Sequence, residues 1–323
     1  MVKRAGVSIT PLFVFLFVVS TLLSLHVAAA LAQRKITFAT STAGGARMMT
    51  DVMKANKFDK KHGLDLDLKF FPGAKAVQAV IFNKTETGVF NPLVAAHQLA
   101  EGHHFVNFEI AMDVHVSVLV PPGSPIKTVA ELKGKKFGFF SRGSGIYPAF
   151  QMIMALRGRD IEKEFQLIIG NPFAIKAFLQ RKQVDGAIQF EPFTSVLLTN
   201  NQARQIAWVG DMWNKATGNR PLLFVTIAAR KSWIDANPKA ARNLARAIAE
   251  TRAWIVAHPD EAVKLGNKAL KITDPKVIET VKKRMIPIYK TPWDDAAVKA
   301  GNWFFTKAVE FGILEKLPAK NLF

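Results

Sequence analysis

The chain of 323 residues is long enough for two ordinary domains, and it contains no cysteine, which excludes disulfides and a lipid-modified cysteine. Its 44 lysines and arginines against 25 aspartates and glutamates give a formal net charge of +19, an excess that attracts anions. The basic residues are spread along the whole sequence, with neither a basic tail nor an aromatic-interleaved basic strand, which argues against a nucleic-acid partner.

The N-terminal residues have the pattern of a secretion signal. A positive start with Lys3 and Arg4 precedes an almost unbroken apolar run over residues 11–30. Ala-Leu-Ala at 30–32 then supplies the small residues of a peptidase site, which predicts cleavage of a signal peptide over residues 1–32. The alternative is an uncleaved anchor, because the run is close to the minimum spanning length. We favour cleavage, because an Ala-x-Ala site follows the run and no stop-transfer flank does. No later segment approaches spanning length, so we expect a soluble periplasmic protein without a lipid anchor.

The apolar residues alternate between the periodicity of strands and that of helices along the rest of the chain. In the first part, strands are expected at residues 35–39, 64–70, 87–91 and 104–112. Helices are expected from Met48 to near Gly63, at 74–82 and at 93–100. The strand at 64–70 alternates cleanly between apolar and polar residues, as a half-buried strand should.

The central stretch holds two apolar strands, at residues 115–120 and 135–140, bridged by a Pro/Gly turn and one short amphipathic helix. The second strand stops at a loop of small residues, 141–145, which opens into a helix at 147–156. Helix N-termini attract anions, because their first N–H groups lack partners and carry partial positive charge. We therefore expect this loop to face a ligand.

The remainder continues the alternation and then becomes helical. Strands are expected at residues 165–170, 185–190, 203–210 and 221–229, with a helix at 172–180 and a polar loop at 211–220. The strand at 221–229 is a candidate for an antiparallel strand in an otherwise parallel sheet. From Asn237 the pattern is almost purely helical, interrupted by Pro259, Pro275 and Pro292.

This alternation predicts an α/β fold with parallel sheets that carry helices on both faces. In such sheets, ligands lie at the carboxyl ends of the strands, where helices begin. The rule selects four turns, at residues 41–45, 90–91, 141–145 and 189–191. They fall into two groups of similar local order, separated by the strand at 115–120.

Four motifs along the mature chain resemble those of one family. They are FDKKHGLDLDLKF (58–70), VAELKGKKFGF (129–139), FLQRKQVDGAIQFEPF (178–193) and AHPDEAVKL (257–265). In order and spacing they are similar to motifs of the periplasmic solute-binding proteins of nitrate, sulfonate and taurine ABC importers, a group that also includes thiamine-precursor binding proteins. The chain departs from the family pattern where Asn83 and Lys182 replace glycines and Glu86 replaces an aspartate, whereas Asp185 is kept.

The resemblance implies a two-lobed periplasmic-binding-protein-like fold of type II, with two parallel-sheet lobes joined by a two-strand hinge. Lobe 1 is expected to comprise residues 33–115 and 224–323, and lobe 2 residues 116–223. A small ligand, an organic anion of the sulfonate, taurine or nitrate class, binds in the cleft, and the lobes close around it. A membrane ABC permease is the implied partner. Neither catalysis nor a cofactor is implied, and we expect a monomer.

The expected ligand-binding residues lie on the four turns. They are Ser41, Thr42, Ala43 and Gly44; Phe90 and Asn91; Ser141, Arg142, Gly143, Ser144 and Tyr147; and Glu191. Glu191 suits an amine-bearing ligand such as taurine, or else it pairs with a nearby arginine. Five aromatic residues at or near strand ends are candidates for an apolar wall, although each is more often a core residue: Phe90, Phe140, Tyr147, Phe190 and Trp213.

Other functional signals are weak. His97, His103, His104 and His115 lack the cysteines or the spacing of a metal site, so no metal is expected. Residues 124–127 match S-x-x-K, but the motifs that accompany it in penicillin-binding enzymes are missing. Two alternatives to transport remain open: a ligand sensor for a membrane receptor, and an enzyme of the pyrimidine-precursor (thiamine) branch of the same fold.

Overall fold

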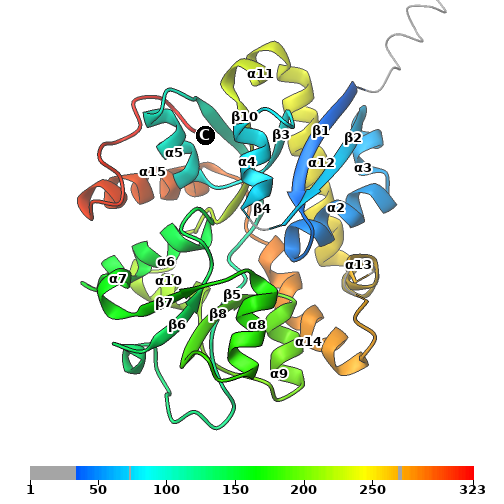
Figure 1. Cartoon of the computed structure of the whole chain (residues 1–323). Helices are drawn as coiled ribbons and strands as arrows, with labels where there is room; N and C mark the ends of the chain where they lie inside the picture. The colour runs from blue at the N-terminus through cyan, green and yellow to red at the C-terminus, as the bar shows by residue number, and fades with distance from the viewer. Residues whose placement is uncertain (1–33, 73, 268–270) are drawn as a thin grey trace, which may run out of the picture.

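The computed structural model describes residues 34–72, 74–267 and 271–323, which form two α/β lobes, one above the other in Figure 1. The predicted signal peptide at 1–32 lies outside the described residues. None of the helices in the described ranges is both long enough and apolar enough to span a bilayer. The chain crosses between the lobes at residues 113–115 and again at 218–224.

The sheet of the first lobe has the strand order β2-β1-β3-β10-β4. Its strands are β1 (Arg34–Ser41), β2 (Leu64–Phe71), β3 (Thr87–Phe90), β4 (Phe105–Met112) and β10 (Val225–Arg230). β1 runs parallel to β2 and β3, whereas β10 is antiparallel to β3 and β4.

The sheet of the second lobe has the order β7-β6-β8-β5-β9. Its strands are β5 (Val116–Val120), β6 (Lys136–Phe139), β7 (Gln166–Ile169), β8 (Gly186–Phe190) and β9 (Arg204–Trp208). β6 is parallel to β7 and β8, and β5 is antiparallel to β8 and β9. The two sheets therefore share one topology, although the sequence has no clear internal repeat.

The expectation of purely parallel sheets was wrong, because each sheet contains one strand that arrives from the other lobe. β5 and β10 enter their sheets directly after a crossing, at the edge where β1, β3, β6 and β8 end. A strand that begins at this edge must run against those that finish there. The reversed direction expected for the strand at 221–229 is confirmed by the antiparallel pairing of β10.

Most helices follow the predicted pattern, although the one expected from Met48 to near Gly63 is divided into two and the helix at 193–199 was not predicted. In the first lobe they are α2 (Gly45–Ala55), α3 (Phe58–Lys61), α4 (Lys75–Ile81) and α5 (Pro92–Ala100). In the second lobe they are η1 (Ala130–Leu132), α6 (Ile146–Ala155), α7 (Ile161–Glu164), α8 (Pro172–Gln180), α9 (Phe193–Thr199) and α10 (Val209–Thr217). The methionines of α2 share one helix face and are buried in the core of the first lobe.

The prediction of a polar loop at residues 211–220 was wrong, because most of these residues belong to α10. Val209, Met212 and Trp213 are spaced at i, i+3 and i+4, so they share one face of the helix, and all three are buried. Gly218, with φ of 68°, ends the helix in the left-handed conformation that glycine favours. The ring of Trp213 lies 6.1 Å from that of Trp303 in α15, within the core.

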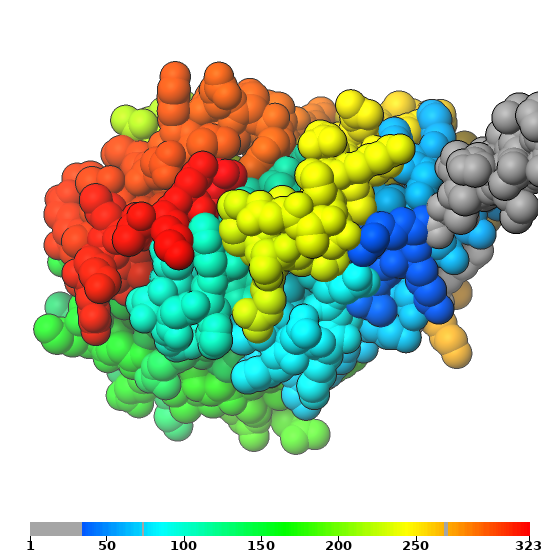
Figure 2. Space-filling view, turned by 90° about the horizontal axis from the view of Figure 1, so that it is seen from above, coloured from blue at the N-terminus to red at the C-terminus, as the bar shows by residue number. Residues whose placement is uncertain are grey.

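The C-terminal helices contact both lobes. They are α11 (Lys231–Ala236), α12 (Pro238–Ala257), α13 (Pro259–Gly266), α14 (Pro275–Met285), η2 (Ile286–Tyr289) and α15 (Asp295–Glu310). α12 packs on α2 and β4 of the first lobe, α14 packs on α9 of the second, and α15 reaches α10. The C-terminal end returns to the first lobe, where the Leu322 carbonyl accepts hydrogen bonds from Asn107, and Figure 2 shows the red end beside the teal segment. We propose that the division into lobe 1 and lobe 2 applies to the two sheets, and that the C-terminal helices connect these sheets.

The two residues that replace glycines both adopt the left-handed conformation. Asn83, which follows α4, has φ of 55°, and Lys182, which follows α8, has φ of 52°. Asparagine tolerates this region, whereas lysine carries the full steric cost of a Cβ atom there. Glycine at either position would adopt this conformation without strain.

The carboxylates that follow these positions also have matching roles. Glu86 accepts a hydrogen bond from the backbone N–H of Thr37 in β1 at 2.8 Å, and Asp185 accepts one from Lys136 in β6 at 2.9 Å. Glu86 thus ties the residues before β3 to the neighbouring β1, and Asp185 ties the residues before β8 to the neighbouring β6. The change from aspartate to glutamate at position 86 therefore concerns the fold of the lobe.

Replacing Lys182 with glycine is expected to stabilise the protein by about 0.5 kcal/mol, because relief of left-handed strain exceeds the added entropy of the unfolded chain. Both Lys182 and Asn83 are exposed, so the loss of packing is small. Urea denaturation of Lys182→Gly measures the effect, and Asn83→Gly, where the strain is smaller, is the matched control. A gain in the asparagine variant that equals the gain in the lysine variant would contradict this explanation.

Candidate functional site

A cavity of about 730 Å³ lies between the lobes and is lined by residues from both. Its walls contain the carboxyl ends of β1 and β3 from the first lobe and of β6 and β8 from the second. Since the sheets present these ends toward each other across the hinge, the cavity is where the strand-end rule places a ligand (Figure 1).

The structure brings together seven of the residues expected at the site. Those that line the cavity are Ser41, Thr42, Ala43, Phe90, Asn91, Ser141 and Ser144. Five others do not line it: Gly44, Arg142, Gly143, Tyr147 and Glu191. Of the aromatic candidates, Phe90, Phe140 and Phe190 contribute to the wall, whereas Tyr147 and Trp213 do not.

The lobes approach each other closely at two glycines. A Cβ atom on Gly44, whose φ is 80°, would lie 3.2 Å from the Phe190 ring, and one on Gly145 would lie 3.1 Å from the Asn91 amide nitrogen. Each contact joins a turn of one lobe to a strand end of the other. A side chain at either position would therefore push the lobes apart.

Asn91 is buried, and both its side-chain oxygen and its amide nitrogen make hydrogen bonds within the protein. Its side-chain oxygen accepts a hydrogen bond from Leu93 N–H at 2.9 Å, and its amide nitrogen donates to the carbonyl of Phe224 at 2.9 Å. It thus caps α5 and joins the first lobe to the second crossing segment. The arrangement positions the cavity wall and uses one of the two amide hydrogens of Asn91.

Arg142 and Tyr147 turn toward α7. Arg142 donates two hydrogen bonds to the carboxylate of Glu162, at 2.7 and 2.8 Å, and the Tyr147 hydroxyl donates to the same group. These contacts raise the pKa of Arg142, while burial raises the pKa of Tyr147 to about 12. Both residues therefore support the loop at 141–145 from outside the cavity.

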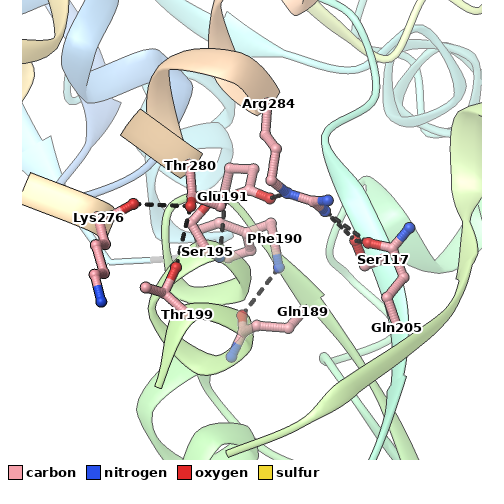
Figure 3. A network of polar contacts seen from close by, with 10 residues as sticks. All are labelled: Ser117, Gln189, Phe190, Glu191, Ser195, Thr199, Gln205, Lys276, Thr280 and Arg284. Carbon is pink, nitrogen blue, oxygen red and sulfur yellow. Dashed lines mark hydrogen bonds and ion pairs between the residues drawn. The ribbon is translucent and has the colours of Figure 1, made fainter. Parts of the chain in front are cut away.

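Glu191 pairs with an arginine, which was one of the two interpretations of this residue. Its side chain is completely buried, forms an ion pair with Arg284 of α14, and accepts hydrogen bonds from Ser195 N–H at 3.1 Å and Oγ at 2.5 Å. Arg284 also donates to Ser117 Oγ at 2.9 Å and to Gln205 Oε1 at 2.7 Å. Figure 3 shows these groups converging on the arginine, which links the C-terminal helices to the second sheet.

The start of α2 faces the cavity without a side-chain cap. Gly45 and Ala46 line the cavity, and the N–H groups of residues 45–47 have no hydrogen-bond partner in the described parts of the chain. These groups carry the partial positive charge of a helix N-terminus. The hydroxyl of Thr42 beside them also makes no hydrogen bond with any described residue, so several donors are free for a ligand.

Sequence reasoning missed the cavity residues that follow β2 and β7. Lys75 and Gln78 come after β2, and Asn171 and Phe173 come after β7. The rule that selected the other strand ends could have found them, had it been applied to the strands expected at 64–70 and 165–170. His115 and Phe224, which lie on the crossing segments, also line the cavity.

Aromatic rings form a continuous cluster on one side of the cavity. Phe190 is its centre, with ring centroids 5.5 Å from Phe140 and 5.5 Å from Phe193. Phe173 extends the cluster at 5.1 Å from Phe193, and His115 joins it at 5.7 Å from Phe190. Apolar walls with a few directed polar groups are typical of sites for organic small molecules.

His115 is the polar group on the hinge side of this cluster. Only 7% of its surface is exposed, and its Nδ1 lies 3.3 Å from the carbonyl oxygen of Asp113. Burial lowers the pKa of His115 to about 4, so the imidazole is neutral at physiological pH. A neutral imidazole is a hydrogen-bonding group without the desolvation cost of a charge.

Lys75 carries the only charged side chain among the described residues that line the cavity, counting Lys, Arg, Asp and Glu. No carboxylate opposes it there, so the cavity favours an anion over a cation. Within the described ranges, no group of three His, Cys, Asp or Glu side chains is placed to hold a metal ion.

Comparison with known proteins agrees with this architecture. The sequence profile described as NMT1/THI5 like matches residues 52–262, about two thirds of the chain. A binding protein of Brucella abortus is 26% identical over 215 residues, which are 66% of this chain and 64% of that protein, and a binding protein of Brucella suis matches equally. The matched region thus spans slightly less than two thirds of the length of these relatives.

Solved structures share the fold at low identity. The alkanesulfonate-binding protein SsuA from Xanthomonas axonopodis pv. citri, bound to MOPS, has a TM-score of 0.71 at 17% identity, over 90% of this chain and 96% of that one. The periplasmic nitrate-binding protein NrtA from Synechocystis PCC 6803 has a TM-score of 0.67 at 15% identity, over 88% and 83%. The chain therefore belongs to the NMT1/THI5-like family and has the two-lobed fold of periplasmic binding proteins.

Proposed function

We propose that this protein is the extracytoplasmic substrate-binding component of an ABC importer, which captures a small organic anion in the cavity between its lobes. The observation that carries the proposal is a cavity of about 730 Å³ that is lined by both lobes and faced by the uncapped start of α2. The proposal describes a binding protein without catalysis, which acts as a monomer and delivers its ligand to a membrane permease. The predicted signal peptide supports a periplasmic location.

Closure of the lobes is the proposed means of capture. The only covalent links between the two sheets within the described chain are the crossings at residues 113–115 and 218–224, which suits a hinge. The contacts at Gly44 and Gly145 support a closed arrangement, because each brings one lobe against the other beside the cavity. A ligand that touches both lobes would stabilise this state by its differential affinity.

The class of ligand is supported by similarity and by the cavity itself. The structural relatives are described as alkanesulfonate-binding and nitrate-binding proteins. In this chain, Lys75 and the start of α2 provide positive charge and free N–H donors. The volume favours a molecule larger than nitrate, since pockets of roughly 300–1,000 Å³ hold organic ligands of drug size.

A thermal-shift screen of sulfonates, taurine, nitrate, bicarbonate, aromatic carboxylates and pyrimidines tests the proposal. At least one compound should raise the melting temperature by an amount that grows with its concentration, as mass action requires. Turnover of the bound compound, or the absence of stabilisation by every class, would overturn the proposal.

Replacing Gly145 with valine is expected to weaken ligand binding by about 10-fold or more, since the new side chain meets Asn91 and opposes closure. Gly143→Val is the matched control, because a Cβ atom at Gly143 has no neighbour within 4 Å. Isothermal titration with the best compound of the screen compares the two variants. Equal affinity in both would argue against closure at this contact.

A further inference from the structure

The positive and aromatic groups of the cavity lie on different lobes. Lys75 and the uncapped start of α2 belong to the first lobe, whereas Phe140, Phe190 and Phe193 belong to the second. The second lobe also presents the start of α6, but Gly145 is packed against Asn91 there, and Arg142 is paired with Glu162. A ligand that uses both walls must therefore have an anionic head and an aromatic or otherwise apolar body.

The tautomer of His115 adds a third requirement. Its Nδ1 lies 3.3 Å from the Asp113 carbonyl, and since a carbonyl only accepts, Nδ1 must carry the proton. Nε2 of the neutral ring is then a bare acceptor. It has no hydrogen-bond partner among the described residues, although His115 is 93% buried, with 7% exposed, and lines the cavity.

Nε2 is not among the fully buried polar atoms without a partner in the described parts of the chain, so this acceptor is open to the cavity, where a ligand or water can satisfy it. The neighbours of the imidazole are the rings of Phe190 and Phe224, at centroid distances of 5.7 and 5.9 Å, and neither ring offers an N–H or O–H donor. The acceptor thus lies beside the aromatic wall. A hydroxyl group on an aromatic ring would reach it when the ring packs against that wall.

We propose that the cavity binds a hydroxyaryl anion, with its charged head toward Lys75, its ring against Phe190, and its phenolic hydroxyl donating to Nε2 of His115. This inference rests on the proposed function and specifies the ligand of the same site. One or two rings suit a cavity of about 730 Å³.

Titration calorimetry with matched compounds tests each part of the inference. The three hydroxybenzoate isomers are compared with their methoxy analogues, which keep the ring and oxygen but lose the donor. 4-Hydroxybenzamide removes the charge, and 4-hydroxycyclohexanecarboxylate removes the aromatic ring. At least one hydroxybenzoate should bind about 10-fold more tightly than its methoxy analogue, because a site that hydrogen-bonds a hydroxyl rejects the analogue lacking it.

Two variants assign the contacts. His115→Phe should bring the hydroxy and methoxy compounds to within about 3-fold of each other, since the acceptor is gone while the ring remains. Lys75→Met should weaken hydroxybenzoate about 10-fold and leave hydroxybenzamide unchanged, because only the first carries a charge. Lys75 is exposed and makes no ion pair with any described residue, so this variant should fold normally and the test does not depend on the histidine variant.

The outcomes separate this inference from the proposed function. Binding of alkanesulfonates, taurine or nitrate without binding of any hydroxybenzoate would overturn the inference and leave the importer proposal standing. Equal affinity for hydroxy and methoxy compounds would overturn it as well. If no anion of any class binds, both the inference and the proposed function are wrong.

Discussion

Replacing Arg284 with methionine is expected to destabilise the protein by about 3–5 kcal/mol, the usual cost of leaving a buried charge without its partner. The Glu191 side chain is completely buried, and that of Arg284 is 20% exposed. Ser195 would remain as a donor to the carboxylate, but it carries no charge. Arg284 also donates to Ser117 and Gln205, so the variant loses two further hydrogen bonds, although Ser117 still donates to Gln205.

Urea denaturation at pH 7.5 measures this loss, and Arg142→Met is the matched control. Arg142 donates two hydrogen bonds to Glu162, yet the two side chains are 60% and 42% exposed, so solvent screens the pair and no measurable change is expected. In the double variant Arg284→Met/Glu191→Met, part of the stability should return, because no charge is left buried. A loss that is the same at Arg284 and Arg142 would show that burial does not decide the strength of these pairs.

Acidification is expected to destabilise the protein through His115 by about 2 kcal/mol between pH 7.5 and pH 5. Burial lowers the folded-state pKa of His115 from 6.5 to about 4, so the unfolded chain binds a proton at pH values where the folded protein does not. The contribution of the neutral imidazole is therefore fully present above pH 6.5 and is lost as the pH falls toward 4. The cause is the burial of the ring between Phe190 and Phe224.

The comparison of wild type with His115→Gln isolates this effect. Burial raises the pKa of Glu109 to about 7 and also raises that of Asp113, so these two carboxyl groups favour the folded state as the pH falls. Both carboxyl groups are present in wild type and in the variant, so their contributions cancel when the two free energies of unfolding are subtracted. The stability advantage of wild type over the variant should shrink by about 2 kcal/mol on going from pH 7.5 to pH 5. A difference that is constant with pH would show that His115 is not buried as a neutral ring.

The sequence was sufficient for most of the elements and for the strand ends that line the cavity. The alternation of periodicities predicted most strands and helices, because side-chain spacing depends only on local geometry. The ends of β1, β3, β6 and β8 all line the cavity, as the strand-end rule predicts, since that rule follows from how helices leave a sheet. The wrong prediction of a loop at 211–220 has a local cause as well. Val209 was assigned to the strand expected at 203–210, so the helical face that it shares with Met212 and Trp213 was missed.

The direction of charged side chains could not be read from the sequence. Arg142 and Glu191 both follow strands that end at the cavity, yet each turns away from it toward an opposite charge. Their partners, Glu162 and Arg284, lie 20 and 93 residues further along the chain. A partly buried charged group turns toward an oppositely charged or hydrogen-bonding partner, because an unpaired buried charge is costly. That partner lies far along the chain and is known only from the folded structure.

The sequence by itself determined the α/β class and the strand ends that line the cavity, because both depend on local periodicity. The division into two lobes was implied by the resemblance of four motifs to those of periplasmic solute-binding proteins. Only the tertiary structure decided that the strands entering from the other lobe run antiparallel, that the C-terminal helices bridge both lobes through Arg284, and that Lys75 and His115 face the cavity. The physical reason is that these features arise from contacts between segments far apart in the chain, which exist only once the two lobes have packed together.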